Sequence, residues 1–220
     1  MTTKSDIHRW ADPSPAGLVA TALSCFVFFA MHSGRVEANA APLLGIWLLG
    51  GFIVQVIVGL IELKHGNLIG GNVFLFFSAF FMFVTGVELL FKFWMTQNGI
   101  VLDASIDGWA WLALAIALLT WTPAYLKNSN AVMSFSILSL DVAVPLTAVK
   151  DLGLLGSGAT LVAVTHIIAY SMLVAGILAL YVASTTILNQ SMGRTVIKVP
   201  GPLIRTRITA KKLQPACIAE

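Results

Sequence analysis

The residues of this sequence that could do chemistry are carboxylates and amides gathered where long apolar runs break. The stretch 59–71, GLIELKHGNLIGG, holds Glu62 and Asn67, with Gln55 shortly before it and Asn72 directly after it. Glycines among them allow backbones and side chains to approach closely. Taken alone, this is a solvated loop between two membrane helices. The alternative is the polar mouth of a pathway through a helix bundle.

A second candidate is Asp141, an acid inside the otherwise apolar run 131–149. A carboxylate at membrane depth is costly unless it is protonated, paired or hydrated. Pro145 follows it and predicts a helix kink that frees a carbonyl nearby. Two interpretations stay open: a neutral or partnered structural acid, or a proton relay or selectivity group.

A third candidate is the helix start at 11–18, ADPSPAGL. Proline is tolerated in the first turn of a helix, so Pro13 and Pro15 mark where this helix begins. If Pro13 to Gly17 lie at membrane depth, unpaired backbone N–H groups and the positive dipole end point into the bundle and could bind an anion. The simpler interpretation is an ordinary helix start at the membrane interface.

Other kinds of site find little support in the sequence. It contains no nucleophile paired with a base, no metal-binding cluster and no phosphate-binding loop. The two cysteines, Cys25 and Cys217, suggest no disulfide framework. We therefore expect a protein that is not an enzyme and has no cofactor, no bound metal and no nucleic-acid partner.

The composition indicates which kind of secondary structure holds the polar candidate residues in place. The 220 residues are 58% hydrophobic and 10% charged, whereas soluble domains carry about 25% charged residues. Lipid must therefore cover the surface, and a spanning helix needs about 20 apolar residues. Apart from Asp141, the long runs without Asp, Glu, Lys or Arg are 13–34, 38–61, 65–87, 108–126, 131–149 and 152–193. The sequence thus predicts an all-α polytopic membrane protein with six transmembrane helices.

The chain divides into a polar tail at 1–12, a six-helix domain at 13–190 and a basic tail at 191–220. The first tail lacks the apolar region of a signal peptide, so the first helix is retained. With six spans, both termini lie on one side, where most Lys and Arg residues also fall. Cytoplasmic loops carry this excess, so we expect cytoplasmic termini in the plasma (inner) membrane.

Two further side-chain patterns concern the membrane interfaces. Glu88 and Lys92 have the i,i+4 spacing of a helical ion pair. Trp109, Trp111 and Trp121 bracket the fourth predicted span, which is typical of an interfacial aromatic belt.

Three landmarks in order resemble the acetate uptake transporter family of bacteria and fungi. The family's signature Asn-Pro-Ala-Pro-Leu-Gly-Leu reads DPSPAGL here, at 12–18. The segment 50–71, GGFIVQVIVGLIELKHGNLIGG, is similar to the family's second landmark. The third is the end of the last helix, where the matching residues are His166, Gly176, Tyr181, Leu188, Asn189, Gly193, Arg194 and Thr195.

The resemblance implies a homo-hexamer in the lipid bilayer whose subunits each have a pore for acetate and similar small monocarboxylates, with succinate a candidate. It places a hydrophobic constriction at Thr21, Phe77 and Leu140, and a substrate-selecting small residue at Ala179. Proton coupling is also expected. The residues expected to bind the substrate or form the mouths are Pro13, Pro15, Gly17, Gln55, Glu62, Asn67, Asn72, His166 and Tyr181.

This chain departs from the family pattern at several of these positions. Asp12 replaces the signature Asn, Ala16 replaces a Leu, Thr21 replaces a Phe and Phe77 replaces a Tyr. Asp141 follows Leu140 where no acid is expected. A second function therefore stays open, that of a transport-inactive scaffold or accessory subunit that kept the fold.

Overall fold

The computed structural model describes residues 10–204. Within them are six helices long and apolar enough to cross a membrane. The outer parts of both predicted tails, 1–9 and 205–220, lie outside the described residues. The elements in chain order are α1 Ser14–His32, η2 Ala38–Ala40, α2 Ala41–Lys64, α3 Leu68–Phe76, η3 Phe77–Val84, α4 Thr85–Gln97, α5 Ser105–Asn128, α6 Ala131–Asp151 and α7 Ala159–Ser191.

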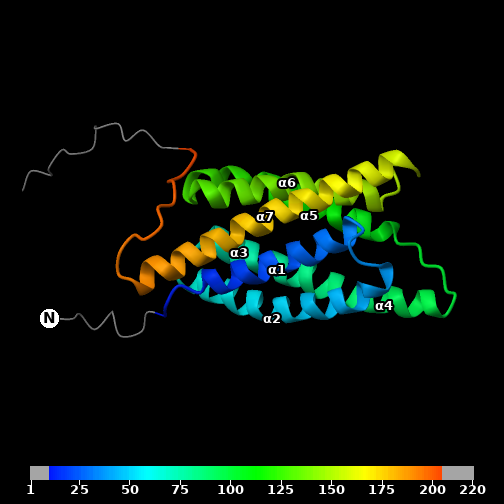
Figure 1. The fold of residues 1–220 in the computed structure, drawn as a ribbon, viewed down its shortest axis with the longest axis horizontal. Coiled ribbons are helices and arrows are strands. Elements are labelled where there is room, and N and C mark those ends of the chain that lie inside the picture. Colours follow the sequence, from blue (N-terminus) through cyan, green and yellow to red (C-terminus); the bar gives the residue numbers. More distant parts are fainter. Residues whose placement is uncertain (1–9, 205–220) are drawn as a thin grey trace, which may run out of the picture.

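The helices pack side by side as a closed bundle (Figure 1). α1 packs against α7 and α2, α6 lies between α5 and α7, and α2 covers the third span formed by α3, η3 and α4. α3 also contacts α5, so the circle of helices closes. Both ends of the described chain lie at one end of the bundle, and the α4–α5 connection lies at the other.

The polar hairpin between α2 and α3 forms where the sequence predicts it. Gly66 has a positive φ of 81°, a conformation that glycine adopts without steric cost. Asn67 caps α3, because its Oδ1 accepts a hydrogen bond from the Gly70 N–H at 3.0 Å. A Cβ at Gly59 would lie 3.1 Å from the Gly71 carbonyl oxygen. The glycines therefore let α2 and α3 approach backbone to backbone.

The third span differs from a regular helix. Its middle, Phe77–Val84, is a π-helix between two α-helical segments, which nothing in the sequence pattern indicated. Phe77 and Phe81 are buried, whereas Phe80 and Phe83 are exposed on the bundle surface. Isolated π-helical turns are rare and occur often at functional sites.

Two of the three tryptophans predicted to form an aromatic belt are exposed. Trp109 is 62% exposed and Trp121 also lies at the surface, as interfacial residues should. Trp111 is only 9% exposed, so the prediction for it is wrong. On α5, the Trp111 ring instead turns inward and packs on Phe81, with 5.8 Å between ring centroids.

After α7, the chain returns across the same end of the bundle (Figure 1). Asn189 holds the start of this segment: its Oδ1 accepts from the N–H groups of Val196 and Ile197, and its Nδ2 donates to the Ile197 carbonyl. Farther on, the Ile204 N–H donates to the Leu126 carbonyl of α5. Backbone bonds therefore tie this segment to the bundle.

Candidate functional site

A cavity of about 330 Å³ opens at the end of the bundle where the described chain begins and ends. We call it the terminal-side vestibule. The predicted constriction residues Thr21, Phe77 and Leu140 all line it, and all three are buried. Its polar lining residues are Asp12, Ser14, Thr21, Asn67, Tyr125, Asn128, Ser129, Asn130, Ser136 and Thr186.

The start of α1 borders this vestibule. Asp12 Oδ1 accepts a hydrogen bond from the Ser14 N–H at 2.9 Å, so a carboxylate of the chain itself satisfies this helix-start donor. Pro13 is half-buried and Pro15 is buried in the bundle. Gly17 fits against Phe74, since a Cβ there would lie 2.5 Å from a ring carbon. These residues shape the start of α1. Asp12, Ser14 and Phe74 line the vestibule, whereas Pro13, Pro15 and Gly17 do not.

Gln55 fixes the turn of α1 that carries Thr21. Its side chain is fully buried. Nε2 donates to Thr21 Oγ1 at 2.6 Å and to the Gly17 carbonyl at 3.1 Å. Thr21 Oγ1 in turn donates to the same carbonyl at 3.0 Å. Gln55 is therefore a positioning residue behind the vestibule wall and is not itself part of the lining.

The α2–α3 hairpin contributes three lining residues to the vestibule, Asn67, Ile69 and Gly70, of which Asn67 has a polar side chain. Asn67 lines the vestibule, and its Nδ2 donates to the Glu62 carboxylate. Glu62 is buried behind it. Asn72, in contrast, donates to the Leu68 carbonyl of its own helix at 2.7 Å and does not line the vestibule. The polar stretch thus forms the α2–α3 hairpin, and the side chain of Asn67 lines the vestibule. Its role as the mouth of a pathway stays a prediction.

The remaining predicted residues on α7 do not come together with this site. Ala179 is buried in a small cluster with Leu18 and Phe74, directly behind the lining. His166 is exposed on an open groove of about 770 Å³ outside the bundle, between α6 and α7. Tyr181 is exposed as well, with its hydroxyl 3.5 Å from the Lys198 carbonyl oxygen. Ala179, His166 and Tyr181 are close in the sequence, but they do not line one common cavity.

Asp141 does not line the vestibule, although its neighbour Leu140 does. Its Oδ2 accepts a hydrogen bond from Thr122 Oγ1 of α5 at 2.7 Å. Its Oδ1 is buried without a hydrogen-bond partner among the described residues. The acid is thus half-partnered at the α5–α6 contact, and a relay role stays a prediction.

An aromatic stack closes the inner end of the vestibule, and sequence reasoning missed its centre. Phe81 is 1% exposed. Its ring centroid lies 5.2 Å from that of Phe77 and 5.1 Å from that of Phe28. Trp111 packs on its other side. The i,i+4 spacing of Phe77 and Phe81 was the available signal, hidden by the many other phenylalanines of this span.

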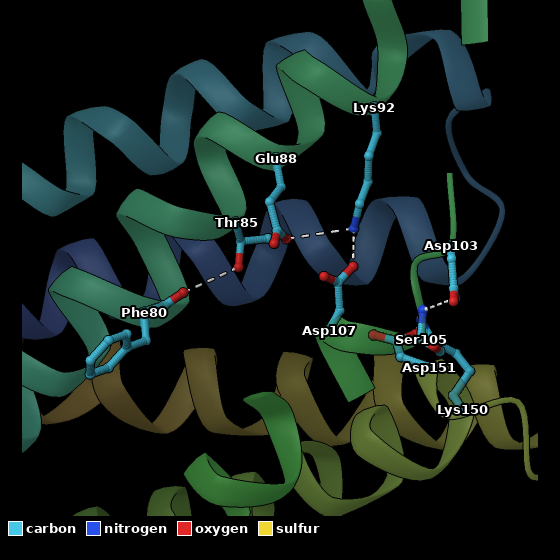
Figure 2. A network of polar contacts seen from close by, with 9 residues as sticks. All are labelled: Phe80, Thr85, Glu88, Lys92, Asp103, Ser105, Asp107, Lys150 and Asp151. Carbon is cyan, nitrogen blue, oxygen red and sulfur yellow. Dashed lines mark hydrogen bonds and ion pairs between the residues drawn. The ribbon is translucent and has the colours of Figure 1, made fainter. Parts of the chain in front are cut away.

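A second cavity, of about 390 Å³, lies beyond this stack, and we call it the distal vestibule. Phe28 and Trp111 line it, so Phe81 separates the two vestibules. Charged side chains gather there (Figure 2). Lys92 Nζ is paired with Asp107 and lies 3.5 Å from Glu88 Oε2, which confirms the predicted helical ion pair. The charged and histidine lining residues are His32, Glu88, Lys92, Asp107, Lys150 and Asp151.

Comparisons with known proteins find relatives that are named as transport proteins. The chain is 27% identical over 193 residues to the succinate-acetate/proton symporter SatP of Escherichia coli K12, across 87% of this chain and 96% of that protein. Over 78 residues it is 32% identical to the ammonia transport outward protein 2 of Saccharomyces cerevisiae, across 34% of this chain and 27% of that protein.

A solved structure described as that of the bacterial acetate channel SatP aligns with a TM-score of 0.72 and 24% identity, over 86% of this chain and 99% of that chain. This chain therefore has the same fold as that structure. With six apolar helices and these relatives, the chain is an integral membrane protein. The model of the GPR1/FUN34/yaaH family matches residues 2–201, and the chain belongs to that family.

Proposed function

We propose that this chain carries acetate and similar small monocarboxylates across the membrane. The path runs from the terminal-side vestibule, past Phe77 and Leu140, through the contact at Phe81, and into the distal vestibule. The observation that carries the proposal is this arrangement of two cavities separated by one layer of buried rings. A hydrophobic constriction of this kind keeps out water and hydrated ions.

We further propose that the carboxylate crosses with a proton, as the neutral acid. Carboxyl groups have ordinary pKa values of about 4 and are ionised at neutral pH, and a bare carboxylate is costly to dehydrate. The neutral acid needs only hydrogen-bond partners, which the polar side chains of the terminal-side vestibule can supply. The relative named a succinate-acetate/proton symporter supports this mechanism.

The assembly and setting are also proposals. A homo-hexamer in the plasma (inner) membrane, with cytoplasmic termini, fits the family resemblance and the distribution of basic residues. Many large apolar side chains are exposed on the single subunit, including Ile167 and Val174 beside the α6–α7 groove. Lipid or neighbouring subunits would cover them.

Uptake of labelled acetate into liposomes containing the purified full chain tests the transport proposal. We expect uptake above protein-free liposomes, and accumulation when a pH gradient is imposed. Uptake without accumulation would support a channel and refute proton coupling. No uptake under either condition would refute transport.

The second candidate, a transport-inactive scaffold or accessory subunit, is favoured by one observation. The Asp12 carboxylate, which replaces the family's Asn, adds a negative charge to the lining of the terminal-side vestibule, and this charge would repel an incoming carboxylate. A scaffold would co-purify in stoichiometric amount with a larger membrane complex and give no acetate flux alone. Robust flux by the purified chain would exclude it.

A further inference from the structure

The distal vestibule contains an excess of negative charge. Three carboxylates, those of Glu88, Asp107 and Asp151, face two ammonium groups, those of Lys92 and Lys150. His32 is the other titratable side chain in the lining. All of these residues belong to the described part of the chain. Several of them lie next to the α4–α5 connection, which is at the opposite end of the bundle from the two ends of the described chain (Figure 1).

Both lysines are already paired with acids of the chain. Figure 2 shows Lys92 of α4 reaching between Glu88 and Asp107. Asp107 is the closer partner, while Glu88 Oε2 is 3.5 Å from Lys92 Nζ. Lys150 Nζ lies 3.2 Å from Asp151 Oδ1. One lysine therefore serves two carboxylates, and Glu88 is the acid without a close cation of its own.

This surplus charge is poorly screened by solvent. The Asp107 side chain is only 10% exposed, and the Glu88 side chain is 33% exposed. Charges in partly buried positions interact more strongly than charges in bulk water, and salt screens them less. Repulsion also scales with the charge of the incoming solute, so it is absent for a neutral acid, present for a monoanion and doubled for a dianion.

We infer that the distal vestibule selects against dicarboxylates and that Glu88 is the residue that sets this selectivity. The inference rests on the proposed transport of small carboxylic acids and narrows their class to monocarboxylic acids. It runs against the candidate succinate activity, because succinate is a dianion at neutral pH.

Glu88→Gln is the sharpest variant for testing this. It removes the surplus charge and leaves the Lys92–Asp107 pair, which connects α4 to α5, in place. Glu88→Asp keeps the charge and should behave like wild type. Asp103→Asn is the matched control, because Asp103 is an exposed acid in the same α4–α5 connection and does not line the vestibule.

The experiment compares uptake of labelled acetate and labelled succinate into liposomes at neutral pH, with the membrane potential held at zero. We expect wild type to prefer acetate strongly. In Glu88→Gln the succinate-to-acetate ratio should rise at least about fivefold, because one charge a few ångströms away has this effect even in bulk water and a larger one in a partly buried position. That rise should shrink only modestly at high ionic strength, because salt screens partly buried charges less than exposed ones.

Each other outcome speaks against a specific claim. Equal uptake of acetate and succinate by wild type, or an unchanged ratio in Glu88→Gln, would overturn the selectivity inference alone. The same rise in Glu88→Asp or Asp103→Asn would overturn the role of the Glu88 charge. Wild type that carries neither acid would refute the proposed transport function, and this inference with it.

Discussion

Gln55 Nε2 of α2 donates a hydrogen bond of 2.6 Å to Thr21 Oγ1 of α1. The same amide nitrogen donates to the Gly17 carbonyl one turn earlier. A residue of one helix thus fixes the position of a pathway-lining residue on another. The hydrogen bond connects two polar groups that are unusual inside an apolar bundle: the buried amide of Gln55 and the hydroxyl of Thr21 at the proposed constriction.

Gln55→Leu should destabilise the protein and disturb uptake. It removes both interhelical hydrogen bonds and leaves the Gly17 carbonyl with fewer donors, a loss of about 1–3 kcal/mol for a buried polar contact. The melting temperature of the detergent-solubilised protein should fall. Asn72→Leu is the matched control, because that amide bonds only within its own helix. Equal effects of the two substitutions would contradict a positioning role for Gln55.

Thr21→Phe should narrow the pathway beside Phe77 and Leu140, since it adds a ring to a lining position. We expect uptake of longer monocarboxylates to fall more than uptake of acetate, measured as a ratio across a series of chain lengths. Thr21→Val keeps the volume and removes the hydroxyl, so it should preserve the ratio while lowering stability. A length profile unchanged by Thr21→Phe would exclude this residue from size selection.

Leu140→Ala should widen the pathway and relax the selection of small acids. The side chain is 2% exposed and lines the terminal-side vestibule, so its truncation leaves space at a predicted narrow point. Longer acids should gain uptake relative to acetate in liposomes. Leu138→Ala, on the outer groove of the same helix, provides the control. If both variants behave alike, the constriction lies elsewhere.

Phe81→Ala should connect the two vestibules and let hydrated ions leak. The Phe81 ring is the contact shared by Phe77, Phe28 and Trp111. Truncating a buried Phe also costs about 3–5 kcal/mol of stability, so Phe81→Leu should be measured beside it. Dye-reported leakage of protons and small ions is the assay, with Phe80→Ala, an exposed neighbour, as the control. A tight membrane with Phe81→Ala would refute the barrier.

Asp141→Asn tests the relay hypothesis. A relay acid is required to exchange protons, so the substitution should flatten the dependence of acetate uptake on pH. Thr122→Val removes the hydrogen-bond donor to Asp141 and keeps the acid, so the pH dependence should persist. If Asp141→Asn retains the wild-type pH profile and only lowers the melting temperature, the acid has a structural role.

The spans were predictable because charges are excluded from lipid, so gaps between charged residues mark helices directly. The α2–α3 turn was predictable for a similar reason, since polar residues and glycines cluster there. The lining positions of Thr21, Phe77 and Leu140 came from the family resemblance, and spacing alone would not have selected them.

The missed features depend on contacts between helices. Lys92 and Asp107 are fifteen positions apart on different helices, and only the packing of the α5 start beside α4 makes them partners. Trp111 differs from Trp109 by the side of α5 on which it lies, which hydropathy does not reveal. His166 and Tyr181 belong to a sequence landmark, but the side of α7 that they occupy leads away from the vestibules.

The π-helical segment Phe77–Val84 has a consequence for the whole far half of its span. A π-helix holds an extra residue relative to the α-helix around it, so it sets the rotational register of everything that follows. Losing one residue there would restore regular winding and rotate α4 by about 100°. Glu88 and Lys92 would then face away from Asp107. The extra residue of the π-helix, and not the choice of side chains, therefore allows Phe81 to face the barrier while Glu88 and Lys92 face Asp107.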